Sequence, residues 1–410
     1  MGLKRIVKKS LGLGEMGFTK DGGKINWFPG HMAAATRAIK NRLKLSDLVI
    51  EVRDARVQQI PLSSAHSELQ PQLSAKRRVL ALNKKDLANP NILNKWVHYF
   101  DSCNQDCIAI NGHSKSSVQK VSVDTAMSEC KPLIAFLLDL VELKLKEVIS
   151  REPTLLVMVV GVPNVGKSAL INSIHQIALS RFPGKMLLCL VTYDRIVLNN
   201  IEKMKRATVG PLPGVTQDIA GYKIAHRPSI YVLDTPGVLV PSISDIETGL
   251  KLALAGSVKD SAVGEERIAQ YLLAVLNSRG TPFHWWHLDN RREVNQFESD
   301  NKHEYDPKDL RPKKRKLPNV SDVLYVEDMV TEVQRALHAT LSEFDGNVED
   351  ENDLENLIEQ QFEVLQKALK IPHKATEARL MVSKKFLTLF RTGKLGPFIL
   401  DDVPDVNTNS

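Results

Sequence analysis

The stretch GVPNVGKS, residues 161–168, decides what kind of fold this sequence can adopt. It matches the phosphate-loop pattern G-x-x-x-x-G-K-[ST] and lies between an apolar segment, TLLVMVVG (154–161), and a helical segment, KSALINSIHQI (167–177). In such a loop backbone amides surround a phosphate, the lysine contacts the β- and γ-phosphate oxygens, and the serine hydroxyl binds Mg²⁺. The predicted phosphate-binding residues are Asn164, Val165, Gly166, Lys167, Ser168 and Ala169.

A second motif, DTPG (234–237), ends the β-strand pattern SIYVLD (229–234). A carboxylate here lies near the metal and a glycine amide lies near the γ-phosphate, so Asp234 is predicted to bind Mg²⁺ and Gly237 to bind the nucleotide. Upstream, LPGVTQD (212–218) offers Thr216 as a switch threonine that binds Mg²⁺ when the γ-phosphate is present. The predicted Mg²⁺ ligands are thus Ser168, Thr216 and Asp234, and the predicted catalytic residues are Lys167, Thr216 and Gly237.

The tetrapeptide NKKD (83–86) ends another apolar run and predicts which base is bound. In this motif the Asp86 carboxylate accepts hydrogen bonds from the guanine N1–H and exocyclic amine, while Asn83 and the Lys84 stem support the ring. Adenine offers an acceptor at N1 and no 2-amino group, so it would leave the carboxylate unpaired at a high cost. The motif therefore predicts GTP and GDP as ligands rather than ATP. A third base-side loop is expected at AINGH (109–113), where Asn111 and Gly112 are further predicted GTP-binding residues.

The order of these motifs is inverted, because the base-reading tetrapeptide precedes the phosphate loop. Parallel α/β sheets bind ligands at the carboxyl ends of their strands, so a chain that is cut in one loop and rejoined at another rebuilds the same pocket. The sequence predicts an α/β fold: a circularly permuted P-loop GTPase domain with a parallel sheet, followed by an α-helical C-terminal domain. Because the switch segments directly precede that helical domain, their nucleotide-dependent order can be relayed into it.

The expected domain organisation follows from the change of hydrophobic period along the chain. Residues 1–24 form a basic arm that resembles an organellar transit peptide, with a plain basic arm as the alternative. The GTPase domain is expected over 25–243, and five segments with a 3.6-residue period place the helical domain over 244–400. A polar loop near 289–320 contains RPKKRK (311–316), which is either an RNA-contacting or nuclear-import run or a solvated loop, and 401–410 form a tail.

Composition restricts the classes of protein that need to be considered. The 410 residues are 43% hydrophobic and 25% charged, which is typical of a globular protein, and no run approaches the ~18 apolar residues of a membrane span. A net charge of +7 favours an anionic partner, either nucleic acid or an anionic membrane, and charge alone does not choose between them. The four cysteines have neither zinc nor disulfide spacing and indicate a reducing compartment: Cys103, Cys107, Cys130 and Cys189.

Together, the ordered motifs FPGHM, DAR (54–56), NKKD, GVPNVGKS, PGVT and DTPG resemble the circularly permuted GTPases that carry an Asp-Ala-Arg motif, in particular their ribosome-assembly group. The resemblance implies hydrolysis of GTP to GDP and phosphate, coupled to maturation of the large ribosomal subunit, with the subunit and its rRNA as partners. It further implies a K⁺ activator beside Asn164. Asp54 and Arg56 match the family motif and act either as a brace at the strand end or in the chemistry.

The same resemblance favours a mitochondrial location, in the matrix or associated with the inner membrane through the ribosome, with plastid or nucleolus as alternatives. Val238 stands where small GTPases have a water-orienting glutamine, so we expect slow intrinsic turnover that K⁺ and ribosomal particles raise. Two other functions stay open: a non-catalytic, GTP-gated RNA-binding scaffold, and a signalling GTPase with a protein effector.

Two segments depart from the family pattern. The residues VQQ (57–59) intervene between the Asp-Ala-Arg motif and IPLSS, which leaves the geometry of that loop open. The spacing from Ser168 to Thr216 is longer than expected, and the excess centres on 184–204. That segment is either a genuine insertion or sequence translated from an unspliced intron.

Overall fold

The computed structural model describes residues 30–58, 73, 76–113, 154–181, 219–226, 229–239, 245–278, 320–372 and 377–404. Four predictions fall on residues outside these ranges: the basic arm, the segment 184–204, Thr216 and the RPKKRK run. The described residues form two compact units. We call them the sheet unit, which ends at Val263 and resumes at Pro397, and the helical unit between Gly264 and Gly396.

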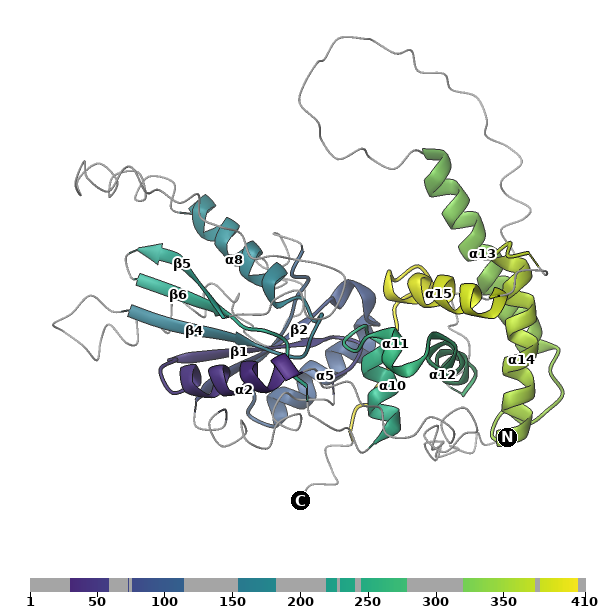
Figure 1. Ribbon diagram of the computed structural model, residues 1–410, viewed down its shortest axis with the longest axis horizontal. Coiled ribbons are helices and arrows are strands. Elements are labelled where there is room, and N and C mark those ends of the chain that lie inside the picture. The colour runs from purple at the N-terminus through teal and green to yellow at the C-terminus, as the bar shows by residue number, and fades with distance from the viewer. Residues whose placement is uncertain are drawn as a thin grey trace, which may run out of the picture. The chain divides into compact units, whose positions relative to one another are not determined.

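The sheet unit is built on a six-stranded sheet with the order β3-β2-β1-β4-β6-β5 (Figure 1). The strands are β1 (Leu48–Asp54), β2 (Arg77–Asn83), β3 (Cys107–Ala109), β4 (Thr154–Val160), β5 (Ala220–His226) and β6 (Ser229–Asp234). All neighbouring pairs are parallel except β5–β6, which is antiparallel. The predicted parallel sheet is confirmed in four of its five strand pairs, and the edge strand β5 is antiparallel because a two-residue connection cannot make a parallel crossover.

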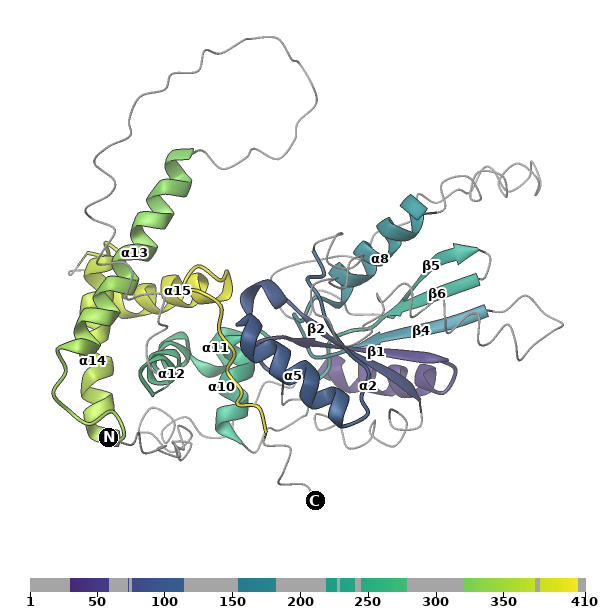
Figure 2. The same cartoon turned by 180° about the vertical axis from the view of Figure 1, so that it is seen from behind.

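Helices cover both faces of the sheet (Figures 1 and 2). On one face lie α2 (Gly30–Leu43) and α5 (Pro90–Ser102), and on the other lies α8 (Lys167–Arg181). Ile39 and Leu43 of α2 pack with apolar side chains of β1, β4 and β6 in one core cluster. Trp96 of α5 packs with β2 and β3 in another. The cores hold the strand ends, and therefore the loops that follow them, in fixed positions.

The sheet unit also contains two short helices and the C-terminal segment of the chain. The helices are α10 (Ile246–Leu254) and α11 (Asp260–Val263). The boundary between the two units follows α11, so it lies further along the sequence than the expected boundary at 243/244. Ile399 enters the α5 core cluster, and Asp401 forms an ion pair with Lys251 of α10 at 3.1 Å. We call residues 397–404 the C-terminal strap.

The helical unit consists of α12 (Glu265–Ser278), α13 (Val320–Ser342), α14 (Glu351–Ala368) and α15 (Ala378–Arg391), as the 3.6-residue pattern predicted. Helix α12 packs against α14 and α15, and α13 packs against α14. Asn277 and Gln361 exchange two amide hydrogen bonds of 2.8 Å across the buried α12–α14 contact. No helix within the described ranges is long and apolar enough to cross a bilayer.

Candidate functional site

The phosphate loop joins the end of β4 to the start of α8. Gly161 has φ 155°, and a Cβ at this position would lie 2.4 Å from the carbonyl oxygen of Val52. Only glycine lets the loop pass this close to β1. The buried Lys167 ammonium folds back over the loop and donates to the carbonyl oxygens of Gly161 and Val162, at 3.1 and 2.9 Å. The loop therefore has the geometry that the motif predicted, with the lysine over its backbone.

Ser168 and Asp234 meet beside this lysine. The Ser168 hydroxyl donates to Asp234 Oδ2 at 2.6 Å, and among the described residues none donates a hydrogen bond to the buried Oδ1. Burial raises the pKa of Asp234, although the Ser168 hydrogen bond and the Lys167 charge oppose the shift. Burial likewise lowers the pKa of Lys167 to about 8, with Asp234 opposing. A hydroxyl and a carboxylate oxygen that face one another form an oxygen donor set that suits Mg²⁺.

The segment after Asp234 runs close to the phosphate loop. A Cβ on Gly237 would lie 2.4 Å from the Pro163 Cα, so the backbone at Gly237 has no room for a side chain. Val238 is fully buried in the α2 core cluster, which explains why its side chain is apolar and keeps it away from solvent. A buried valine cannot orient an attacking water molecule.

The base-side loops meet the phosphate loop through one amide. Asn83 Nδ2 donates to the Val165 carbonyl at 2.7 Å, and Asn83 Oδ1 accepts from the Gly112 amide at 2.7 Å. Val165 is 82 positions away in the sequence and Gly112 is 29 positions away. A Cβ on Gly166 would lie 2.4 Å from Asn83 Nδ2, so that glycine makes the contact possible. The two halves of the pocket thus meet as the permuted order predicted.

The geometry gives Asn83 a structural role besides the predicted one. We predicted that it supports the guanine ring, and in this structure both polar atoms of its amide bind protein, with the side chain 1% exposed. Its position is that of a brace between three loops. Asn111 is similarly occupied, because its Oδ1 accepts from the His113 amide at 3.0 Å. Gly112 is held through both of its backbone polar groups. Its amide donates to Asn83, and its carbonyl accepts from the Ser173 hydroxyl of α8 at 2.5 Å.

The remaining residues of the base-reading turn are more open. Asp86 is exposed, at the start of the short 3-10 helix η2 (Lys85–Leu87). Lys84 is partly buried, has a left-handed backbone with φ 62°, and its ammonium lies 3.0 Å from Asp54 Oδ2. Asp54 belongs to the Asp-Ala-Arg motif, so the structure joins two motifs that the sequence analysis treated separately. Neither motif carries a local signal of this link, which follows from the strand register that places Asp54 opposite Asn83.

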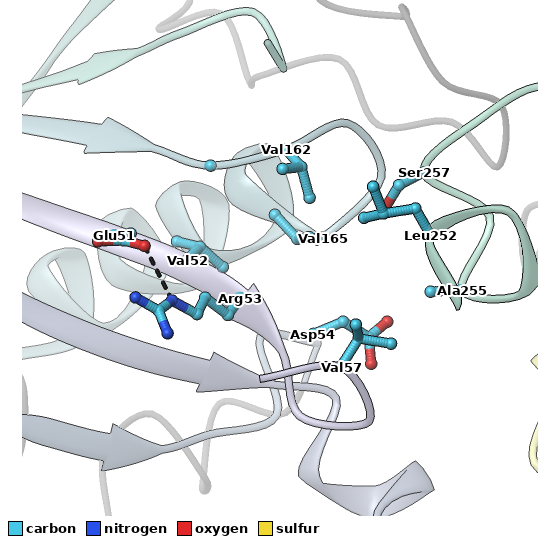
Figure 3. A pocket seen from close by; sticks show the side chains of 11 residues that line it. Glu51, Val52, Arg53, Asp54, Val57, Val162, Val165, Leu252, Ala255 and Ser257 are labelled. Carbon is cyan, nitrogen blue, oxygen red and sulfur yellow. Dashed lines mark hydrogen bonds and ion pairs between the residues drawn. The ribbon is translucent and has the colours of Figure 1, made fainter. Parts of the chain in front are cut away.

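Asn164, the predicted K⁺ ligand, faces a different element. Its Nδ2 donates to the carbonyl of Gly256 at 3.1 Å, just after α10, which leaves Oδ1 as the amide atom that can coordinate a cation. The neighbouring loop also borders a small, largely apolar cavity between the end of β1 and α10 (Figure 3). Its lining includes Asp54, Val57, Val162, Leu252 and Ser257.

The chain was compared with known families and proteins. No family model matches it. It is 70% identical over 410 residues to Short integuments 2, mitochondrial, of Arabidopsis thaliana, which covers 100% of this chain and 97% of the relative. It is 39% identical to DAR GTPase 2, mitochondrial, of the same plant, over 92% of this chain and 90% of the relative. Mitochondrial ribosome-associated GTPase 1 of Mus musculus is 36% identical over 62% of this chain and 67% of that protein.

The names of all three relatives support a mitochondrial location for this chain. The motif order, the α/β sheet with a helical C-terminal region and these identities agree. The chain therefore belongs to the circularly permuted GTPases that carry the Asp-Ala-Arg motif.

Proposed function

We propose that this protein binds and hydrolyses GTP and that it assists assembly of the large ribosomal subunit in mitochondria. The observation that supports the binding step best is the Asn83 amide, which holds the base-reading turn and the phosphate loop together. Such a constellation fixes the distance between a purine and its phosphates. It supports a nucleotide ligand in preference to a free phosphate or a free base.

In this proposal each site residue acts on one part of the nucleotide. Asp86 pairs with the guanine edge, the amides of the phosphate loop bind the β-phosphate, and Lys167 neutralises the β- and γ-phosphates. Ser168 and Asp234, together with Thr216, would hold Mg²⁺, which when bound supplies positive charge to the phosphate oxygens. The buried Oδ1 of Asp234 fits this assignment, because a bound cation would provide its partner.

We expect slow intrinsic hydrolysis that an external group or ion accelerates. Val238 is buried, so water would have to be oriented by another group, and the Gly237 amide is the neighbouring donor for the γ-phosphate. A K⁺ ion at Asn164 Oδ1 would add positive charge beside the phosphates. The ribosomal particle is the proposed source of the remaining acceleration.

The proposal of a ribosomal partner is based on the names of the relatives and on the net charge of this chain. One relative is named a mitochondrial ribosome-associated GTPase, and this chain carries a net charge of +7, which favours association with rRNA. Contact with the inner membrane would then be peripheral and pass through the ribosome. The basic arm at residues 1–24 is the proposed import signal, and a fluorescent fusion that lacks it should lose its mitochondrial distribution.

The decisive experiment measures GTP hydrolysis by the purified chain in KCl and in NaCl, with and without mitochondrial large-subunit particles. The proposal expects K⁺ and particles each to raise turnover, and expects Lys167→Ala to abolish nucleotide binding. Co-sedimentation with the particles should depend on GTP and should weaken steeply with salt and after ribonuclease treatment. Particle binding that is insensitive to both salt and ribonuclease treatment would favour a protein effector instead.

The buried Val238 favours one second candidate, a GTP-gated scaffold that binds RNA without turnover. The same assay distinguishes the GTPase from the scaffold. Particle binding that requires GTP, together with hydrolysis that stays at background in K⁺, would select the scaffold.

A further inference from the structure

The Asp-Ala-Arg motif has no assigned task in the proposed function, yet its carboxylate makes four contacts near the site. The buried Asp54 accepts from Arg56 three times: from the amide at 3.0 Å, from Nε at 2.9 Å and from Nη2 at 2.8 Å. The Lys84 ammonium makes the fourth contact, at 3.0 Å. Burial alone would raise the pKa of Asp54, but the charges of Arg56 and Lys84 outweigh it and keep the pKa well below its usual range.

The backbone of Lys84 has an uncommon conformation, and two contacts hold this residue in place. It has φ 62°, in the left-handed region that a lysine seldom adopts, and it turns the chain from β2 into η2 directly before Asp86. The Asp54 ion pair fixes the end of the Lys84 side chain, while the hydrogen bond from the Lys85 amide to Ile110 fixes the backbone that follows. The Lys84 side chain is therefore fixed at its ammonium and at the backbone that carries it.

Arg56 holds the same carboxylate. It is 1% exposed, and burial lowers its pKa, but Asp54 and then Asp86 raise it above its ordinary value. Its amide and its guanidinium fix the orientation of the Asp54 carboxylate, and that carboxylate in turn pairs with Lys84.

We propose that Asp54 and Arg56 are positioning residues for guanine recognition: Asp54 anchors Lys84 over the base, and Arg56 holds the Asp54 carboxylate in the orientation that this contact needs. This inference rests on the proposed function and deepens it. It gives the family motif a task on the base side of the pocket, away from the transferred phosphate. It also predicts that the motif changes affinity for GDP and for GTP equally.

The test measures binding of fluorescent mant-GDP, mant-GTP and mant-ATP to the full chain and to four variants. Asp54→Asn and Lys84→Met should each weaken mant-GDP and mant-GTP binding roughly tenfold or more, the range for a lost hydrogen bond to a charged group. The double variant should bind no more weakly than either single variant, because both changes remove one interaction. The unfolding midpoint of each variant is measured in urea alongside.

Glu51→Gln is the matched control. Glu51 lies on the same strand, is fully buried and pairs with two arginines, Arg53 at 2.8 Å and Arg78 at 3.1 Å, but none of these contacts reaches the base-reading turn. It should lower the unfolding midpoint and leave nucleotide affinity unchanged. A purely structural brace would make Asp54→Asn behave in the same way, and that result would overturn the inference.

Further outcomes separate the inference from the function on which it rests. If the unaltered chain shows no preference for guanine over adenine nucleotides, the proposed function is wrong and the inference falls with it. If that preference is present but the Asp54 and Lys84 effects multiply, only the inference is wrong. Should Asp54→Asn fail to fold, Lys84→Met decides alone: it retains the apolar stem, so unchanged affinity would show that the anchored ammonium is unnecessary.

Discussion

At the residue scale, the base-reading tetrapeptide is divided between two environments. Asn83 is the last residue of β2 and is 1% exposed, whereas Asp86, three positions later, is exposed. The left-handed backbone at Lys84 produces this change of direction. Consequently, one end of a short motif holds the protein together and the other end is available to a ligand.

The availability of Asp86 leads to a prediction about base choice. Replacement of Asp86 by Asn presents an amide in place of a carboxylate, which matches the 2-oxo group of xanthine better than the 2-amino group of guanine. We expect Asp86→Asn to lose at least tenfold in affinity for GTP and to prefer xanthosine triphosphate, as measured by competition against a fluorescent nucleotide. Asp106→Asn, at an exposed carboxylate just before β3, is the control and should change neither affinity. Unaltered discrimination in Asp86→Asn would refute the assignment of the turn.

The lowered pKa of Lys167 predicts how nucleotide binding depends on pH. Burial brings the pKa to about 8 without nucleotide, and phosphate oxygens would raise it, because they favour the charged ammonium. Binding at pH 8 should therefore take up part of a proton, and affinity for GDP should fall as the pH rises through 8. Calorimetry in two buffers of different ionisation enthalpy measures this uptake. Because a lysine with a pKa of about 8 is mostly protonated at pH 7, uptake should be smaller there, and uptake at pH 7 as large as at pH 8 would assign the effect to another group.

At the element scale, the C-terminal strap joins three segments that are far apart in the sequence. Leu400 donates its amide to the Arg56 carbonyl at 2.8 Å, and Phe398 donates to the Leu87 carbonyl at 3.0 Å. Asp401 accepts from the Gln58 amide at 2.6 Å and pairs with Lys251 of α10. The Gln58 contact fixes the first residues after the Asp-Ala-Arg motif, and the rest of that loop, from Gln59, lies outside the described residues. The strap therefore binds the base-side loops and α10 at once.

The burial of the strap predicts its contribution to stability. Ile399 is 5% exposed in the α5 core cluster, so Ile399→Ala should lower the free energy of unfolding by about 2–5 kcal/mol, the usual cost of this truncation in a core. Leu45→Ala is the matched control, because Leu45 is 72% exposed and should cost about 0.5 kcal/mol or less. Urea denaturation followed by circular dichroism measures both. Equal effects of the two substitutions would mean that the strap is not docked in solution.

At the scale of the whole molecule, the chain leaves the sheet unit after Val263, forms the helical unit and returns at Pro397. The polypeptide therefore connects the helical unit to the sheet unit at both ends of the helical unit. All predicted nucleotide ligands within the described residues belong to the sheet unit. Binding should thus stabilise that unit directly and the helical unit only through their coupling.

Scanning calorimetry tests this division. GDP at about one hundred times its dissociation constant should stabilise the sheet unit by about 2.7 kcal/mol and raise its transition temperature. The helical unit should unfold in a separate transition that GDP leaves nearly unchanged. A single transition that shifts as a whole would show that the two units unfold as one.

The amino-acid sequence by itself determined the fold class, the phosphate loop, the inverted order of the motifs and the helices of the helical unit. These features depend on local patterns: apolar runs, the 3.6-residue period, and glycines at fixed spacing. They could be predicted because each pattern restricts the backbone where it occurs.

Tertiary structure alone decided the bracing position of Asn83, the link from Asp54 to Lys84 and the docking of the strap. Asn83 contacts Val165 across 82 positions, and Gln58 contacts Asp401 across 343. Contacts at such separations leave no local pattern, because either residue alone is compatible with many surroundings. They arise only when sheet register and core packing bring distant loops to the same edge of the sheet.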